Sequence, residues 1–311
     1  MLARTLSCLL GFGVAASAVT PALAEPLRLK PTSGWELRAY DDKCRMIREF
    51  GSGEDVVTLW IDKGGPGPGL NLTLIGRPLR SPFGATIRVG FTPGELVERN
   101  FITAKSSKGR PVLGMFGVQP VSLLAETGSS GTLAEQPATG EESVDIAQSA
   151  ASEMASEDTI KRRLARIDAL ELSGGVVDPI TLELDRFLPM MGELRTCTEA
   201  LVSRLQQNGP ASGGRQAYPV DQRVWAAKLQ ENYPRHLALA QQQGSVGVRL
   251  TINKEGSPTF CEVISYSGPV SFNETACLLL LQNAKFDPAR DSAGNPVASL
   301  WTTRITYKLR D

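Results

Sequence analysis

The chain has 311 residues, of which 41% are hydrophobic, and it carries 33 basic and 33 acidic side chains. This composition is that of a folded protein, and the length is sufficient for two domains. A net charge of zero argues against nucleic acid or an anionic membrane surface as the main partner.

Residues 1–24 have the pattern of a secretory signal peptide. Arg4 supplies the positive start, residues 6–19 form an apolar core, and Ala22-Leu23-Ala24 fits the small-x-small cleavage rule. We therefore expect cleavage after Ala24. The alternative is an uncleaved membrane anchor, although the apolar stretch is interrupted and shorter than the roughly 20 residues that a spanning helix needs.

Residues 25–124 have the pattern of short strands separated by turns, which predicts a small antiparallel β-domain. The glycine- and proline-rich segment 63–69 is the expected loop between two of these strands. The expected strands lie at residues 35–40, 44–51, 56–61, 70–76 and 86–91, with a weaker one at 112–118.

The composition changes at residues 125–158, which are rich in Ser, Ala, Gly and Glu and contain no aromatic residue. We expect a flexible insertion there. Residues 159–208 regain order as further strands and a helix, although residues 160–170 fit a helix as well as a strand. Residues 209–222 are expected to be a second linker.

Residues 223–311 carry the most informative pattern. After a helical segment that Pro234 interrupts, the sequence predicts a β-β-α-β unit, in which one helix covers one face of a small antiparallel sheet. Ser271 is the expected N-cap of this helix, with Glu274 as its capping-box partner, and Pro288 is expected to end it. The expected elements are strand 245–252, turn 253–256, strand 258–265, turn 265–268, helix 271–286, loop 286–297 and strand 301–309. The predicted fold class is therefore α+β.

Beyond the signal peptide the chain has four cysteines, and an even number in an exported protein suggests disulfides. Four cysteines allow three pairings. Cys261 on the second strand and Cys277 on the covering helix can meet, and the alternative is two unpaired buried thiols. If they pair, Cys44 is the remaining partner for Cys197, which is part of the reason for assigning residues 159–208 to the first domain.

The sequence lacks the usual catalytic and metal-binding sets. The only histidine, His236, lies beside Arg235 on an expected helix, where a surface or packing role is the better interpretation. There is no Gly-x-Ser-x-Gly elbow and no Cys-x-x-Cys motif. We therefore expect no enzyme activity, no metal and no small-molecule cofactor.

The C-terminal unit resembles the C-terminal domain of the TonB family of energy transducers over roughly Val224 to Leu309. The residues that carry the resemblance occur in order and with suitable spacing. They are Tyr233-Pro234, then Gly244, Val246 and Val248, then Asn253–Gly256, Ser267-Gly268, Phe286-x-Pro288-Ala289 and Gly294-x-Pro296-Val297. The preceding part, with WELRAYDDKCRMIREFGSG and LRTCTEAL, resembles exported bacterial proteins of unknown activity that carry this module.

The resemblance implies a binding function in the periplasm. TonB-type domains bind a short extended segment of an outer-membrane transporter, which adds as a strand beside the last strand of the sheet. Here the implied peptide-binding residues are those of the exposed side of that strand together with the Tyr-Pro pair: Thr302, Arg304, Thr306, Lys308, Tyr233 and Pro234. The same polar residues also fit a second interpretation, in which they protect an exposed edge against aggregation.

Two departures from the family limit what the resemblance implies. The family's anchor carries a histidine that this N-terminus lacks, and no long proline-rich spacer is present. We therefore expect a periplasmic protein that binds peptide segments of outer-membrane transporters or other envelope proteins. The alternatives are an atypical energy transducer, if the N-terminus remains as an anchor, and a structural module that packs on its own first domain or forms a homodimer.

Overall fold

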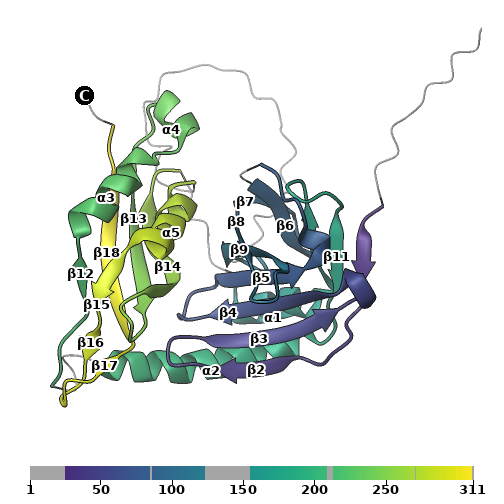
Figure 1. Ribbon diagram of the computed structural model, residues 1–311, viewed down its shortest axis with the longest axis horizontal. Coiled ribbons are helices and arrows are strands. Elements are labelled where there is room, and N and C mark those ends of the chain that lie inside the picture. The colour runs from purple at the N-terminus through teal and green to yellow at the C-terminus, as the bar shows by residue number, and fades with distance from the viewer. Residues whose placement is uncertain (1–24, 85, 123–154, 209–212, 270, 310–311) are drawn as a thin grey trace, which may run out of the picture.

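The computed structural model describes residues 25–84, 86–122, 155–208, 213–269 and 271–309, and its fold is mixed α+β (Figure 1). An N-terminal unit of two β-sheets lies beside a smaller C-terminal unit of one three-stranded sheet, two short strand pairs and helices. The expected signal peptide and most of the expected insertion at 125–158 lie outside the described residues.

The larger sheet of the N-terminal unit has the strand order β2-β3-β4-β5-β9-β8, and all neighbouring strands are antiparallel. β4 and β5 lie in the interior of this sheet and are buried on both faces, whereas β3 alternates between buried and partly exposed residues. Inner strands of a covered sheet are buried on both faces, whereas strands nearer the edge expose alternate residues. The strands span Glu36–Ala39 (β2), Cys44–Phe50 (β3), Val57–Lys63 (β4), Leu70–Gly76 (β5), Ile102–Lys105 (β8) and Pro111–Val118 (β9).

The second sheet brings together strands from both sides of the undescribed segment, in the order β1-β11-β10-β6-β7. Its pairs are antiparallel except for β1 and β11, which are parallel. Short 3-10 turns at Gly53–Asp55 (η1) and Arg77–Leu79 (η2) belong to the same unit. The strands span Leu27–Leu29 (β1), Thr86–Thr92 (β6), Val97–Asn100 (β7), Ala169–Ser173 (β10) and Ile180–Glu183 (β11).

Helices α1 (Glu157–Ala165) and α2 (Phe187–Gln207) complete the N-terminal unit. The ambiguous segment 160–170 is helical as far as Ala165 and then enters β10. The predicted disulfide Cys44–Cys197 joins β3 to α2. The sequence analysis missed β1, β7 and β8, which are short and owe their place in the sheets to pairing with longer strands.

The C-terminal unit has the predicted β-β-α-β order. Its antiparallel sheet has the strand order β14-β13-β18, and α5 covers one face (Figure 1). Alternate residues of β13 point to α5 and are fully buried, because the side-chain period of a strand is two. The elements span Gln222–Glu231 (α3), Arg235–Leu239 (α4), Gly244–Ile252 (β13), Pro258–Ser267 (β14), Ser271–Asn283 (α5) and Ser299–Tyr307 (β18).

Three local predictions for this unit are wrong. β14 continues to Ser267, so the expected turn at 265–268 is shorter. Ser271 is the first residue of α5 and not its N-cap, and the carboxylate of its expected capping-box partner, Glu274, forms an ion pair with Arg99 of the N-terminal unit. Helix α5 ends at Asn283, well before Pro288, because residues 285–287 form a strand instead.

That strand, β15 (Lys285–Asp287), pairs with β12 (Tyr218–Val220), which lies in the segment expected to be a linker. Strand pairing satisfies the backbone of residues 285–287 as well as a continued helix would. Phe286 is buried between Trp225 and Trp301. The rest of the expected loop forms a small hairpin of β16 (Ala289–Arg290) and β17 (Pro296–Val297), in which Gly294 adopts φ +84°.

The two units pack against each other along the outer side of β14 and the start of β18. The Thr251 hydroxyl donates a buried hydrogen bond to the Gly64 carbonyl (2.8 Å), and the Asn208 side chain donates one to the Ala298 carbonyl (2.6 Å). Ala298 belongs to the hydrophobic core of the N-terminal unit. Helix α2 runs along the N-terminal unit to the beginning of β18 (Figure 1).

Candidate peptide-binding edge of the C-terminal sheet

Strand β18 is an edge strand of the C-terminal sheet. It pairs with β13 on one side, and no strand among the described residues pairs with its other side. The side chains of Thr302, Arg304, Thr306 and Lys308 are exposed, whereas Ile305 and Tyr307 between them are buried. The four residues that the sequence assigns to this strand therefore share one open face.

The outer side of β18 also presents backbone groups. The Gln230 side chain of α3 donates a hydrogen bond to the Thr306 carbonyl (2.8 Å), so this carbonyl points away from β13. Peptide groups of a strand alternate in direction, so those of Thr302 and Arg304 point the same way. They are the donors and acceptors that an added strand would use, and α3 partly covers their C-terminal end.

The open face beside this edge is polar and basic. In the register of the sheet, Arg249, Gly247 and Ser245 of β13 lie opposite Thr302, Arg304 and Thr306, respectively. Arg249 is paired with Glu262 of β14 at 3.2 Å. No acidic side chain among the described residues forms an ion pair with Arg304 or Lys308, so their charges are available to a partner.

The structure places Tyr233 and Pro234 away from the open face. The Tyr233 ring packs edge-on against Phe272 (5.3 Å between centroids) and Tyr307 (5.6 Å), and its hydroxyl donates to the Gln242 carbonyl. Phe272 and Tyr307 stack at 4.5 Å, and burial raises the pKa of Tyr307 well above its usual value. Tyr233 thus supports the buried side of β18, and Pro234 precedes the short helix α4.

Two residues that the sequence analysis missed also shape this edge. Gln230 occupies the Thr306 carbonyl, and the Trp225 ring packs on Phe286, which in turn contacts Trp301 of β18. Nothing in the helical pattern of α3 distinguishes Gln230 from its exposed neighbours. Trp225 could have been assigned to the core, because a tryptophan in an otherwise polar helix favours the buried side.

The second predicted disulfide, Cys261–Cys277, joins β14 to α5 and so fixes the helix on the sheet. His236 lies exposed on α4. Among the described residues, no cluster of three or more His, Cys, Asp or Glu side chains could hold a metal ion. In the same part of the chain, no helix combines the length and the hydropathy that crossing a membrane requires.

Comparison with known proteins assigns the C-terminal unit. Residues 230–309 match the family described as Gram-negative bacterial TonB protein C-terminal. Among solved structures, the chain is similar to the solution NMR structure of the Helicobacter pylori TonB C-terminal domain, at 20% identity over 29% of this chain and 78% of that chain, with a TM-score of 0.22. No curated protein matches the chain, and the N-terminal unit has no assigned family. Residues 230–309 are therefore a TonB C-terminal domain, carried behind an N-terminal β-unit.

Proposed function

We propose that this protein is a periplasmic, non-enzymatic binding protein whose TonB C-terminal domain recognises an extended segment of an outer-membrane transporter or another envelope protein. The segment adds to β18 as a fourth strand. The observation that carries this proposal is the outer side of β18, with which no strand in the described part of the chain pairs, in a domain of this family. The two disulfides agree with an oxidising compartment such as the periplasm.

Strand addition would obtain affinity from the backbone and specificity from the side chains. The outward peptide groups of Thr302, Arg304 and Thr306 supply the hydrogen bonds. The charges of Arg304 and Lys308, which form no ion pair within the described ranges, lie on the same face and favour a segment with acidic side chains at alternate positions. Because these charges are exposed, salt should weaken the binding.

The test is a titration with fluorescently labelled extended peptides from the periplasmic ends of outer-membrane transporters. Arg304→Pro removes an outward N–H from the middle of the edge, and we expect it to reduce affinity at least tenfold. The matched control is Tyr266→Pro at the other edge of the sheet, where the peptide group also points outward and the residue is exposed. Circular dichroism of both variants checks that the fold is retained.

Equal losses in the two variants, or undiminished binding by Arg304→Pro, would contradict strand addition at β18. Gln230→Ala supplies an independent variant, because it leaves the strand itself unchanged. If the peptides bind equally well when the β18 edge is blocked, they are recognised by another surface.

A structural role is the second candidate function, and the packing of the two units favours it. The buried Thr251–Gly64 hydrogen bond and the placement of Ala298 in the core of the N-terminal unit show that the C-terminal sheet already has a partner within the chain. If no transporter peptide binds at millimolar concentration, this role is the better one. Light scattering would then distinguish packing within one chain from a homodimer.

An energy-transducing role remains a third proposal and depends on the N-terminus. It requires residues 1–24 to stay attached as an anchor. Intact mass of the exported protein tests this directly, because cleavage after Ala24 would remove the segment.

A further inference from the structure

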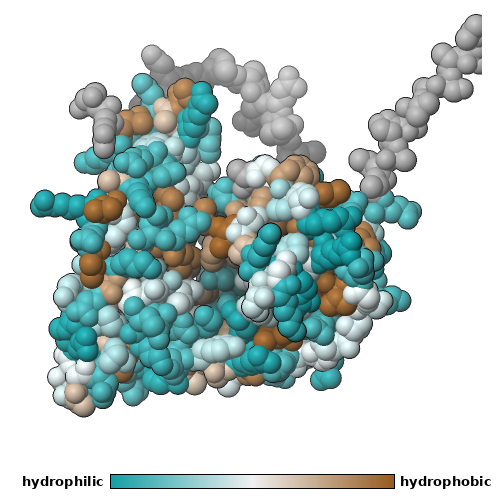
Figure 2. Space-filling model, in the orientation of Figure 1, coloured by the Kyte–Doolittle hydropathy of each residue, from teal (hydrophilic) through white to brown (hydrophobic). Residues whose placement is uncertain are grey.

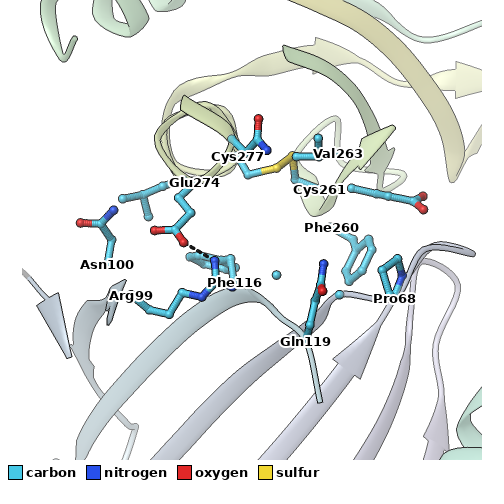
Figure 3. Close-up of a pocket in the computed structure, with 15 residues that line it drawn as sticks. Pro68, Arg99, Asn100, Phe116, Gln119, Phe260, Cys261, Val263, Glu274 and Cys277 are labelled. Carbon is cyan, nitrogen blue, oxygen red and sulfur yellow. Dashed lines mark hydrogen bonds and ion pairs between the residues drawn. A yellow bond between two sulfur atoms is a disulfide. The ribbon is translucent and has the colours of Figure 1, made fainter. Parts of the chain in front are cut away.

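The joint between the two units occupies one edge of the C-terminal sheet. A cavity of about 150 Å³ lies where the units meet, and Arg99 of β7 forms an ion pair there with Glu274 of α5 (Figure 3). Phe260 of the edge strand β14 lies against Gly64 in the loop at residues 63–69. Hydrophobic residues follow the same boundary on the surface (Figure 2). A further strand could not pair with β14 at this place without opening the joint.

Strand β2 (Glu36–Ala39), at the edge of the large N-terminal sheet, is open instead. It pairs with β3, and no strand among the described residues pairs with its other side. Leu37 and Ala39 lie on the face that α2 covers, because Cys44, the register partner of Ala39, is disulfide-bonded to that helix. All four residues of β2 are nevertheless exposed, and Leu37 exposes 38% of its surface. Helix α2 therefore does not extend over this edge.

The backbone of β2 directs hydrogen-bonding groups outward at Leu37 and Ala39. The Tyr40 N–H donates to the Lys43 carbonyl at 2.8 Å across the hairpin, so Tyr40 faces β3. Peptide groups of a strand alternate in direction, so those of Ala39 and Leu37 face away from β3. They are the donors and acceptors with which another strand would pair.

The sequence of β2 is complementary to itself in the antiparallel direction. When Leu37 lies opposite Leu37 of a second copy, Glu36 of each chain lies opposite Arg38 of the other. Opposite charges directly across two strands stabilise the pair, and like charges destabilise it. Within one chain the Arg38 Nε and the Glu36 Oε1 are 2.7 Å apart, and both side chains are more than half exposed. Two such pairs can therefore be exchanged for two pairs between copies without burying an unpaired charge.

We propose that β2 pairs with β2 of a second copy, antiparallel and around a two-fold axis at Leu37, so that the two large sheets form one continuous sheet. Such an interface uses the same surface of both chains and closes at two copies. The partner is a second copy because each strand presents the charges that the other requires, in the opposite order. The two Leu37 side chains meet at the axis and shield each other from water. This edge is separate from β18, and the dimer does not depend on the function proposed for β18.

The experiment is analytical ultracentrifugation of residues 25–311 at micromolar to millimolar concentration, where we expect a monomer–dimer equilibrium. Glu36→Arg and Arg38→Glu each place like charges opposite each other in both cross-strand pairs, so each should weaken the dimer at least tenfold. An equimolar mixture of the two variants should form a heterodimer, because every like pair then becomes an opposite pair. Arg304→Pro should leave dimerisation unchanged, which separates it from association through the C-terminal sheet. Circular dichroism checks that each variant retains its fold.

A cysteine pair tests the register. A hydrogen-bonded pair of antiparallel residues has its Cα atoms about 5.5 Å apart, within the range that a disulfide spans, so Leu37→Cys should form an intermolecular disulfide on mild oxidation. Ala39→Cys is the matched control, because it is exposed on the same strand but would lie about 14 Å from its counterpart in this register. Peptide mapping locates the bond.

Three results would overturn the proposal. A wild type that stays monomeric at millimolar concentration would mean that Glu36 and Arg38 only protect the edge. A mixture of the two charge variants that remains monomeric would show that these residues do not face each other. Crosslinking of Ala39→Cys as readily as Leu37→Cys would exclude the two-fold axis at Leu37.

Discussion

Gln230 controls how much of the β18 edge is open. Its side chain occupies the Thr306 carbonyl, and an added strand that reaches this position must first displace it. A neutral hydrogen bond contributes about 1 kcal/mol net, so Gln230→Ala should strengthen peptide binding roughly threefold to tenfold. Fluorescence anisotropy with the labelled peptides measures the effect.

The control for this prediction is Lys228→Ala on the same helix, which removes a hydrogen bond to Asn283 of α5 instead of the one to β18. Unchanged affinity in Gln230→Ala would mean that the bound segment ends before Thr306. Lower affinity would mean that the amide itself contacts the peptide.

Lys63 provides a pH-dependent test of the buried boundary between the units. Burial lowers its pKa from 10.5 to about 8, and nearby Glu262 opposes this change. Between these two pH values the folded state holds the amine neutral while the unfolded state binds a proton, so the free energy of unfolding must rise with pH. The rise amounts to about 3 kcal/mol between pH 8 and 10.5.

Lys63→Met lacks this titration, and other groups titrate alike in both proteins. We therefore expect the stability of the wild type to increase relative to Lys63→Met as the pH rises through this window, measured by urea unfolding at several pH values. Parallel pH profiles for the two proteins would show that Lys63 is hydrated in solution.

At the scale of elements, the sequence predicted those whose pattern is local. The alternation of β13 and β18 and the helical spacing of α2 are visible in the chain itself, and the structure contains all three. The predicted end of α5 was wrong because the apolar run in the sequence continues to Phe286. Only the pairing of β12 with β15, two segments distant in sequence, shows that the chain leaves the helix at Asn283.

The candidate site divides in the same way. The exposure of Thr302, Arg304 and Thr306 follows from strand alternation and could be predicted. The role of Gln230 could not be predicted, because it depends on how α3 packs beside β18. Tyr233 illustrates the limit of a motif, since its place in an aromatic cluster is fixed by contacts with Phe272 and Tyr307.

The two disulfides stabilise different elements, and their removal should have different effects. Cys261–Cys277 spans 16 residues and joins β14 to α5, so its loss should cost about 3 kcal/mol in the C-terminal unit. Cys44–Cys197 spans 153 residues, and its loss should cost about 5 kcal/mol in the N-terminal unit. Thermal unfolding of the two double alanine variants, with hydrogen exchange to locate the change, measures both.

The exchange pattern separates this prediction from a general loss of stability. In the Cys261→Ala/Cys277→Ala variant, amides of α5 should exchange faster while those of β4 and β5 stay protected. Uniform acceleration throughout the chain would indicate that the two units unfold as one.

At the scale of the whole molecule, the boundary between the units is close-packed. A Cβ atom added to Gly64 would lie 2.7 Å from the Phe260 Cβ, so only glycine allows this approach. Another glycine of the same loop, Gly67, donates its N–H to Glu262 of β14, and the Lys63 amine donates to the Gly67 carbonyl. The loop at residues 63–69 thus holds the N-terminal unit against β14.

The Thr251–Gly64 hydrogen bond is the most direct test of this packing, because it is buried and joins the two units. Thr251→Val keeps the shape of the side chain and leaves the Gly64 carbonyl without its donor, which should cost about 1–3 kcal/mol. The lost stability should weaken the packing between the two units, so amides of residues 63–69 and of β14 should exchange faster than those of the central strands.

Thr259→Val is the matched control, since its hydroxyl bonds the Thr251 carbonyl within the C-terminal unit. If the two variants give the same exchange pattern, the units are held together by their apolar contacts and not by this hydrogen bond.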